Sequence, residues 1–440
     1  MEITELPEPG VVEEVLMRKV FRRIIPFFFL CYVVNYLDRI NIGFAALQMN
    51  KDIGLTPSTF GFAAGLFFIG YFVCEIPSNL MLHRVGGRLW IARIMITWGA
   101  ISAATAVVSS GFSFSAARLL LGMAEAGFTP GVFLFLTYWF PGPWRARAVA
   151  VFLVGSPISS VIGSPISGGL LYLDGLLGLH GWQWLFILEG LPAVLLGVAC
   201  LFVLANGPRG AGWLSTAEKD WLAARLAQEQ EDLAARHGAR LRDAFSGQVF
   251  VFALLNFCGI VGILGVVMWM PQIVSSFGLS YGMTGLVTAL PYLFAAVVMV
   301  LWGRAAARSK RRIFYVVGAE VTAALALVLS VATTSLVLAM LALIVAVCGL
   351  MAWNATFWAL PSSFLTGRAA AGGLAVIVSI GNLGGFFGPY GIGYLREQTH
   401  GFAIPLLSIA VVVLAGAAIM VVVGDPAASG RRRTAAPASN

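Results

Sequence analysis

Two charged residues stand side by side in an apolar stretch near the start of the sequence. Asp38 and Arg39 follow an apolar run over 27–34 and precede another over 42–47. A charge in the middle of a membrane span costs about 2.5–3.5 kcal/mol on insertion scales, so charges retained there point to function. A loop is the alternative, but the flanking runs leave no room for a water-exposed turn. We therefore interpret both residues as part of a membrane-spanning helix.

A second apolar stretch carries another pair of opposite charges. Arg118 and Glu125 are seven residues apart in the sequence, which puts them on one helix face about 10.5 Å apart along the axis. They cannot pair directly in a straight helix, but they can face the same cavity. The arginine would then offer a bidentate fork to a carboxylate, and the glutamate would take up a proton. The alternative is that both lie near helix ends and reach water by snorkelling.

The four residues balance in formal charge, because Arg39 and Arg118 oppose Asp38 and Glu125. An anion that pairs with an arginine upsets this balance, and protonation of a carboxylate restores it. Burial favours the neutral form of a carboxyl group, which makes such protonation feasible near neutral pH. The pattern predicts a proton-coupled carrier of an organic anion. Neighbouring helical residues point about 100° apart, so we expect Arg39 to face the anion path and Asp38 to handle the proton with Glu125.

Composition places the chain in the membrane. Of the 440 residues, 59% are hydrophobic and 11% are charged, against about 25% charged in a soluble domain. The first twenty residues are acidic and then basic, so we expect no cleavable signal peptide. The net charge of +8 comes from the flanks of the apolar runs and gives no reason to expect a nucleic-acid partner. No cysteine or histidine spacing indicates a metal site or disulfide framework.

The apolar runs predict an all-α membrane protein with about twelve spans in two similar six-helix bundles. Lys and Arg gather on alternate loops, so both termini and the linker are expected in the cytoplasm. A capping box from Ser215 to Glu218 begins a predicted amphipathic helix in that linker. The expected divisions are an N-terminal tail (1–23), the first bundle (24–206), the linker (207–245), the second bundle (246–424) and a C-terminal tail (425–440).

Further polar residues are candidates for binding or gating. Tyr36 and Tyr71 in the first half, and Trp358 and Asn382 in the second, could hydrogen-bond a ligand. Glu75 is expected to fix a helix end or pair with a loop arginine. The residues expected at the cytoplasmic gate are Glu75, Arg84, Arg88, Arg304 and Arg308.

No constellation suited to catalysis is evident in the sequence. All four histidines fall at span ends or in loops, so a nucleophile–base–acid set is missing, and no phosphate-binding glycine loop is present. We therefore expect neither an enzyme nor a bound cofactor. Two further intramembrane carboxyl groups, Glu189 and Glu320, are interpreted as structural.

Taken in order, these motifs resemble the anion:cation symporter branch of the major facilitator superfamily, in particular bacterial carriers of organic acids such as tartrate, aldarate, hydroxyphenylacetate or phthalate. The resemblance covers the whole chain except its tails. Its motifs are 35–39 (Asn-Tyr-Leu-Asp-Arg), 75–79 (Glu-Ile-Pro-Ser-Asn), 118–131 (Arg-Leu-Leu-Leu-Gly-Met-Ala-Glu-Ala-Gly-Phe-Thr-Pro-Gly), 181–186 (Gly-Trp-Gln-Trp-Leu-Phe) with Glu189-Gly190, 357–361 (Phe-Trp-Ala-Leu-Pro) and 379–386 (Ser-Ile-Gly-Asn-Leu-Gly-Gly-Phe).

The resemblance implies a symporter in a bacterial cytoplasmic membrane that moves a carboxylated substrate with protons by alternating access. We expect it to work as a monomer. By resemblance, Asp38 and Glu125 are the proton-responsive pair, Arg39 and Arg118 are the substrate and coupling groups, and Asn382 is a ligand contact. The chain departs from the family pattern in three places. Ala307 and His83 stand where an Asp is usual, which removes two partners from the inner gate. Val378 replaces a common Asn, which favours a less polar acid.

Two other functions remain open. A drug-exporting antiporter is suggested by the span-five stretch 163–169 (Gly-Ser-Pro-Ile-Ser-Gly-Gly), although Ser164 interrupts the antiporter motif and two midplane arginines suit anions better. A non-transporting membrane sensor on a carrier fold would normally carry an added soluble domain, and the chain offers only a linker of about forty residues.

Overall fold

The regular elements in the part of the chain that the structure describes are all helices. The computed structural model describes residues 9–235, 245–309, 311–365 and 367–424. Within these residues, twelve helical stretches are long and apolar enough to cross a bilayer, the shortest of 21 and the longest of 40 residues. The predicted fold class and number of spans are thereby confirmed.

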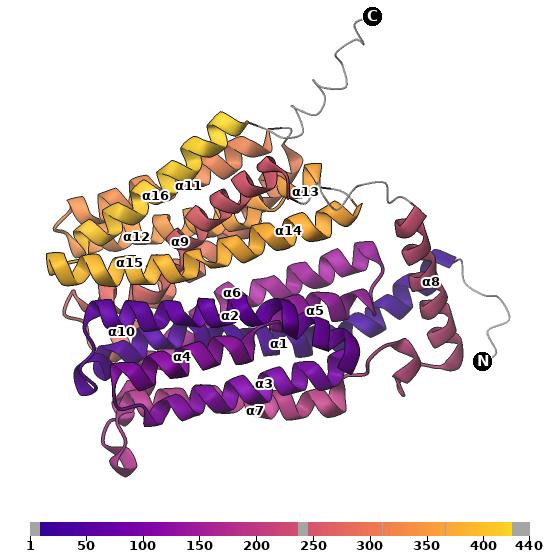
Figure 1. The fold of residues 1–440 in the computed structure, drawn as a ribbon, viewed down its shortest axis with the longest axis horizontal. Helices are drawn as coiled ribbons and strands as arrows, with labels where there is room; N and C mark the ends of the chain where they lie inside the picture. The colour runs from indigo at the N-terminus through magenta and orange to yellow at the C-terminus, as the bar shows by residue number, and fades with distance from the viewer. Residues whose placement is uncertain (1–8, 236–244, 310, 366, 425–440) are drawn as a thin grey trace, which may run out of the picture.

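The helices of the first half are α1 (Pro9–Asp52), α2 (Pro57–Val85), α3 (Gly87–Ala104), α4 (Gly111–Glu125), α5 (Phe128–Thr137), α6 (Gly142–Leu170) and α7 (Gly181–Val203). The linker helix is α8 (Thr216–Ala235). The helices of the second half are α9 (Gly247–Ser275), α10 (Tyr281–Arg308), α11 (Arg312–Ala332), α12 (Leu336–Phe357), α13 (Pro361–Phe364), α14 (Gly367–Asn382), α15 (Gly384–Thr399) and α16 (Ala403–Val423). The two halves lie side by side with their long helices roughly aligned (Figure 1).

The linker helix α8 crosses one end of the first half (Figure 1). It is held there by the ion pairs Lys19–Glu218, at 2.8 Å, and Arg145–Glu229, at 2.9 Å. The predicted capping box is present, because the Ser215 N–H donates to Glu218 and the Glu218 N–H donates to the Ser215 hydroxyl. Residues 236–244 of the linker lie outside the described residues. We call this end of the bundle the linker end and the opposite end the far end.

The first helix is longer than the apolar pattern alone indicates. α1 begins at Pro9, so residues 9–23, expected as a tail, are continuous with the first span. An ion pair from Arg18 to Glu14, one turn earlier, supports this extension. Contacts between α1 and α8 hold this extension against the linker. A pattern of apolar residues does not reveal such contacts.

Two of the spans are each built from two helices. The fourth breaks at Ala126–Gly127, where Gly127 adopts the left-handed φ of 87°. A Cβ at Gly127 would lie 2.3 Å from the Ser78 hydroxyl oxygen, so only glycine fits this turn. The break ends α4 at Glu125 and leaves that carboxyl group at the middle of the span. The eleventh span is divided at Leu383, directly after Asn382, although Leu383 itself keeps right-handed helical φ and ψ of −62° and −26°.

The two halves pack tightly against each other at the far end. A Cβ at Gly61 on α2 would lie 2.5 Å from the Pro389 carbonyl oxygen on α15. The Ser58 N–H, at the start of α2, donates to the Glu397 carboxylate near the end of α15 at 2.9 Å. The far ends of α2 and α15 are therefore closed on each other in this conformation.

Candidate substrate and proton site

An ion pair between two helices of the first half forms the centre of the site. Arg39 on α1 donates from Nε to Glu125 Oε1 at 2.7 Å, and its Nη2 donates to the same oxygen. Glu125 is fully buried, whereas the Arg39 side chain remains 20% exposed. A charge-assisted pair of this kind is among the stronger hydrogen-bonded contacts in proteins. Arg39 therefore holds the Glu125 carboxylate and also reaches the surface of the bundle.

Close packing of α2 on α4 brings the aromatic groups of α2 to the charged residues. A Cβ at Gly122 on α4 would lie 1.9 Å from the Phe67 carbonyl oxygen on α2. As a result, the Phe67 ring lies 5.4 Å from the Arg39 guanidinium carbon and 4.9 Å from that of Arg118. The face of an aromatic ring attracts cations, so Phe67 contributes a favourable contact to both guanidinium groups.

Arg118 is a buried arginine whose hydrogen-bond donors are not all paired. It is 1% exposed, and its Nε and Nη2 atoms are buried without a hydrogen-bond partner. It interacts electrostatically with Asp38 and Glu125 but is hydrogen-bonded to neither. A buried donor left unpaired costs about 1–3 kcal/mol, and more when it is charged. Arg118 is therefore held by charge and ring contacts, with hydrogen-bonding capacity unused.

Asp38 has a different set of partners from its neighbour Arg39. It is 2% exposed, and its Oδ1 accepts hydrogen bonds from the Ser102 hydroxyl on α3 and from Asn41 Nδ2 at 3.1 Å. Its Oδ2 is buried without a partner. The two adjacent residues thus face different groups, as their angular separation on the helix predicts.

Tyr71, Glu75 and Asn382 connect the charged residues to the second half. The Tyr71 ring, almost fully buried, lies 5.3 Å from the Arg39 guanidinium carbon. Glu75 interacts with both Arg39 and the Asn382 side chain on α14. The expectation that Glu75 fixes a helix end or pairs with a loop arginine is wrong, because α2 continues to Val85 and Glu75 is buried at the contact between the halves.

The remaining predicted residues lie outside this cluster. Tyr36 is half-buried, one turn from Tyr32 with ring centroids 6.1 Å apart. Trp358 follows the last residue of α12 and packs edge-on against Phe357, so the structure places it at a helix end. The predicted gating arginines are all exposed at the ends of α2, α3 and α10: Arg84, Arg88, Arg304 and Arg308.

Sequence reasoning missed several side chains around the charges. Phe67 contacts both arginines, and Ser102 donates a hydrogen bond to Asp38. Tyr292 on α10 lies close enough to Tyr36 to interact with it across the two halves. Phe67 lies in an aromatic stretch over 67–72, and Ser102 is a polar residue within an apolar span. Those signals are too common in membrane helices to single the residues out.

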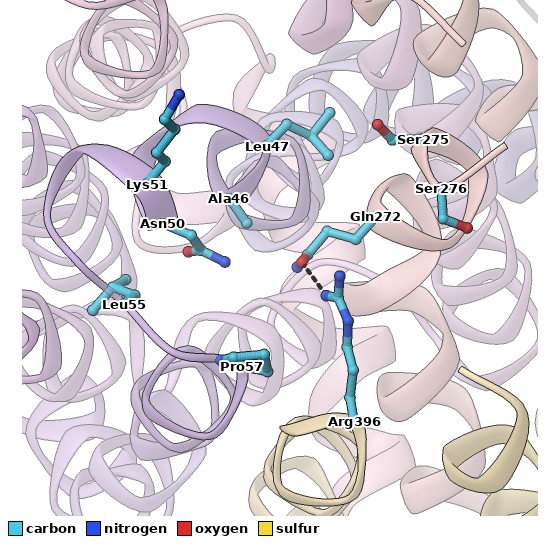
Figure 2. Close-up of a pocket in the computed structure, with 10 residues that line it drawn as sticks. All are labelled: Ala46, Leu47, Asn50, Lys51, Leu55, Pro57, Gln272, Ser275, Ser276 and Arg396. Atoms are coloured by element: carbon cyan, nitrogen blue, oxygen red, sulfur yellow. Dashed lines mark hydrogen bonds between the residues drawn. The ribbon is translucent and has the colours of Figure 1, made fainter. Parts of the chain in front are cut away.

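A cavity of about 360 Å³ lies between the halves at the far end. Figure 2 shows its lining, in which Arg396 donates to the Gln272 side-chain oxygen at 2.6 Å, while Lys51 extends away from Arg396. None of the predicted site residues lines this cavity. Among the described residues, no group of three His, Cys, Asp or Glu side chains could hold a metal ion.

Comparison with known families defines the class of the protein. The sequence profile of the Major Facilitator Superfamily matches residues 28–389. The chain therefore belongs to the major facilitator superfamily, whose members are transporters and not enzymes.

Individual relatives agree with this assignment. A protein of Agrobacterium vitis named "Putative tartrate transporter" is 44% identical over 416 residues, which cover 94% of this chain and 96% of the relative. The "Quinolone resistance transporter" of Acinetobacter baumannii is 39% identical, covering 92% of this chain and 94% of the relative. The resemblance to organic-acid carriers is thereby confirmed.

A solved structure shows the same fold at low identity. An inward-facing, occupied bacterial homologue of the lysosomal transporter Spinster superimposes with a TM-score of 0.74 at 17% identity, covering 91% of this chain and 96% of that one. At this identity the likeness establishes the shared fold and nothing about the transported compound.

Proposed function

We propose that the protein imports an organic anion, such as a mono- or dicarboxylate, a sugar acid or an aromatic acid, together with protons by alternating access. The proposed site is the cluster of Arg39, Arg118, Asp38 and Glu125 on the inner surface of the first half, with Asn382 contacting the ligand from the second. The proposal places the protein in a bacterial cytoplasmic membrane as a monomer, with both termini in the cytoplasm and no cofactor.

The unpaired Arg118 guanidinium is the observation that carries the proposal. Its buried Nε and Nη2 donors have no acceptor in the described part of the protein. The two oxygens of a carboxylate match two parallel guanidinium N–H groups, and the resulting bonds are charge-assisted. A carboxylated substrate would therefore supply the acceptors that the protein does not.

Proton coupling would arise because such a substrate disturbs the ion pair between Arg39 and Glu125. Glu125 is now neutralised by Arg39, whose side chain is the one charged group of the pair that remains partly exposed. An arriving carboxylate competes for Arg39, and a buried glutamate released from its partner is costly until it takes up a proton. Binding of the anion and protonation of Glu125 would then assist each other, with Asp38 as the second acceptor.

The test is uptake of labelled tartrate into liposomes that contain the purified protein, with an imposed pH gradient. We expect accumulation that follows the gradient and stops when a protonophore collapses it. Asp38→Asn should still bind tartrate but lose gradient-driven uptake, because the amide cannot carry the proton.

A matched control is available on the linker helix. Asp220→Asn changes an exposed carboxylate on α8 in the same chemical way and should leave uptake unaltered. Tartrate uptake that persists at full rate without a pH gradient, or in Asp38→Asn, would rule out the proposed coupling.

Export of quinolone-type compounds is a second candidate, favoured by the name of the Acinetobacter baumannii relative. Cells that produce the protein would then accumulate less quinolone than cells that produce Arg118→Ala. The buried charges favour the first proposal, because two arginines at the middle of the fold suit an anion that arrives with compensating protons.

A further inference from the structure

Another buried carboxyl group interacts with the charged cluster but takes no part in the mechanism described so far. Glu189 on α7 is 3% exposed, and its Oε1 accepts a hydrogen bond from the Ser167 hydroxyl on α6 at 2.7 Å. Its Oε2 is buried without a partner. Among the described residues, the groups that interact with it include no arginine or lysine; those groups are Ser167, Asn41 and Asp38.

Asn41 connects Glu189 to Asp38. Its Nδ2 donates to Asp38 Oδ1 at 3.1 Å, and the same side chain interacts with the Glu189 carboxyl group. Asn41 Oδ1 and Glu189 Oε2 are both buried acceptors without a donor. Because the Asn41 side chain interacts with the Glu189 carboxyl group, a proton on Glu189 Oε2 would make that atom a donor and would satisfy both acceptors in one hydrogen bond.

We propose that Glu189 and Asp38 form a coupled pair that holds one proton, with the Asn41 amide oriented by whichever of the two carboxyl groups carries it. In the orientation seen here, Asn41 donates to Asp38; in this state Asp38 would be ionised, and a protonated Glu189 would donate to Asn41 Oδ1. With the amide turned over, Nδ2 donates to an ionised Glu189, and Oδ1 accepts from a protonated Asp38. In both states each polar atom of the Asn41 amide has a hydrogen-bond partner, and the two carboxyl groups together carry one negative charge.

The surroundings restrict the pair to a single negative charge. Glu125 and Arg118 face Asp38 from α4, and Ser102 faces it from α3. Because Arg118 is the only cation in the described part of the chain that interacts with Asp38 and none interacts with Glu189, a second charge would be buried without compensation. Two interacting carboxyl groups at such a site titrate together, and their apparent pKa values belong to the pair and not to either residue.

This inference rests on the proposed function, since it assigns Glu189 to the same proton machinery. Glu189 is a positioning residue in that machinery, because it acts on the coupling residue Asp38, directly and through Asn41, and among its interactions with the described residues there is none with Arg39 or Arg118. Its expected effect is to set the pH range over which Asp38 exchanges its proton.

The first test is infrared difference spectroscopy of the full-length protein in liposomes, without substrate, over a pH titration and with exchange into heavy water. Protonated buried carboxyl groups give carbonyl stretching bands that shift on deuteration. We expect Glu189→Gln to remove one such band at neutral pH and to change the titration of a second band, that of Asp38. Ser167→Ala, which removes the donor to Glu189 Oε1, should extend the first band to higher pH.

Glu320→Gln is the matched control. Glu320 on α11 in the second half is also buried, and neither of its oxygens has a hydrogen-bond partner among the described residues. Its replacement should remove one protonated-carboxyl band but leave the Asp38 titration unchanged, because it lies in the other bundle. An identical Asp38 titration in wild type and Glu189→Gln would overturn the proposal, even if both variants lose a band.

The second test is the pH profile of tartrate uptake. With a permanently neutral neighbour, Asp38 ionises more readily, so the profile of Glu189→Gln should move to the acidic side by about one pH unit. An unmoved profile contradicts the coupling. If wild-type protein takes up no tartrate, the proposed function fails on that compound, whereas the substrate-free spectra still decide whether the carboxyl pair exists.

Discussion

The two halves share one architecture but differ in what they bury. The buried residues of a charged type in the first half lie on four helices: Asp38, Glu75, Arg118, Glu125 and Glu189. Four of them interact as one cluster, and Glu75 interacts with Arg39 beside it. In the described part of the second half, Glu320 is the one buried residue of a charged type, and the other buried polar residues are neutral, such as Asn256 and Gln272.

This difference indicates a division of roles between the bundles. Removing one partner of a buried ion pair costs about 3–5 kcal/mol, because the remaining charge is buried without compensation. Alternating access moves one half against the other, so ion pairs placed across the interface would be broken in each cycle. Keeping Arg39 and Glu125 within the first half avoids that cost, while the second half contributes an amide, Asn382, and packing surfaces.

The largest expected effect is the loss of Arg39. Arg39→Met leaves Glu125 buried without its ion-pair partner, so we expect a loss of about 3–5 kcal/mol in the free energy of unfolding. Denaturant unfolding of the purified protein measures this loss. Arg312→Met, at the exposed start of α11 in the second half, is the control; equal losses in the two variants would erase the contrast between the halves.

Arg118→Ala should abolish transport more completely than it affects stability. Hydrogen bonds to a charged group contribute about 1.5–3 kcal/mol each, so losing two of them from a bound carboxylate should reduce tartrate affinity by about 100-fold or more. Equilibrium binding and uptake of labelled tartrate both report this loss. A variant that binds tartrate as tightly as wild type would show that the anion site lies elsewhere, for example in the cavity of Figure 2.

Gly61→Val tests the interface between the halves without changing a charge. The new side chain would clash with the Pro389 carbonyl oxygen, and overpacking of this kind costs about 1–3 kcal/mol. Only the conformation closed at the far end bears that cost, so its population and the uptake rate should fall about 10-fold while tartrate binding persists. Gly391→Val on α15, where an added Cβ meets nothing within 4 Å, is the control. Equal uptake in the two variants would contradict the closed far end.

Asn382→Ala should have the smallest effect. One neutral hydrogen bond contributes about 0.5–1.5 kcal/mol, so we expect the KM for tartrate to rise several-fold with the folded stability unchanged. A loss as large as that of Arg118→Ala would mean that the second half carries binding energy comparable to the first.

Much of the fold could be predicted because lipid imposes simple rules on a sequence. A span needs about 20 apolar residues with all backbone groups hydrogen-bonded internally, so apolar runs reveal the helices directly. For the same reason, a charge inside a run is conspicuous, and the sequence alone singles out Asp38, Arg39, Arg118 and Glu125. The extension of α1 to Pro9 could not be predicted in this way, since it depends on contacts with α8.

The sequence by itself therefore determined the class of the protein, its spans and the charged residues of the candidate site. Only the tertiary structure decided the partners: Arg39 with Glu125, Asp38 with Ser102 and Asn41, and Glu75 with Asn382. Such pairings depend on how closely helices approach, as α4 approaches α2 at Gly122, and on where a helix breaks, as α4 does after Glu125. Periodicity along one helix carries no information about the distance to the next. For that reason the sequence indicates only a structural role for Glu189, whereas the fold places it beside Asn41 and Asp38.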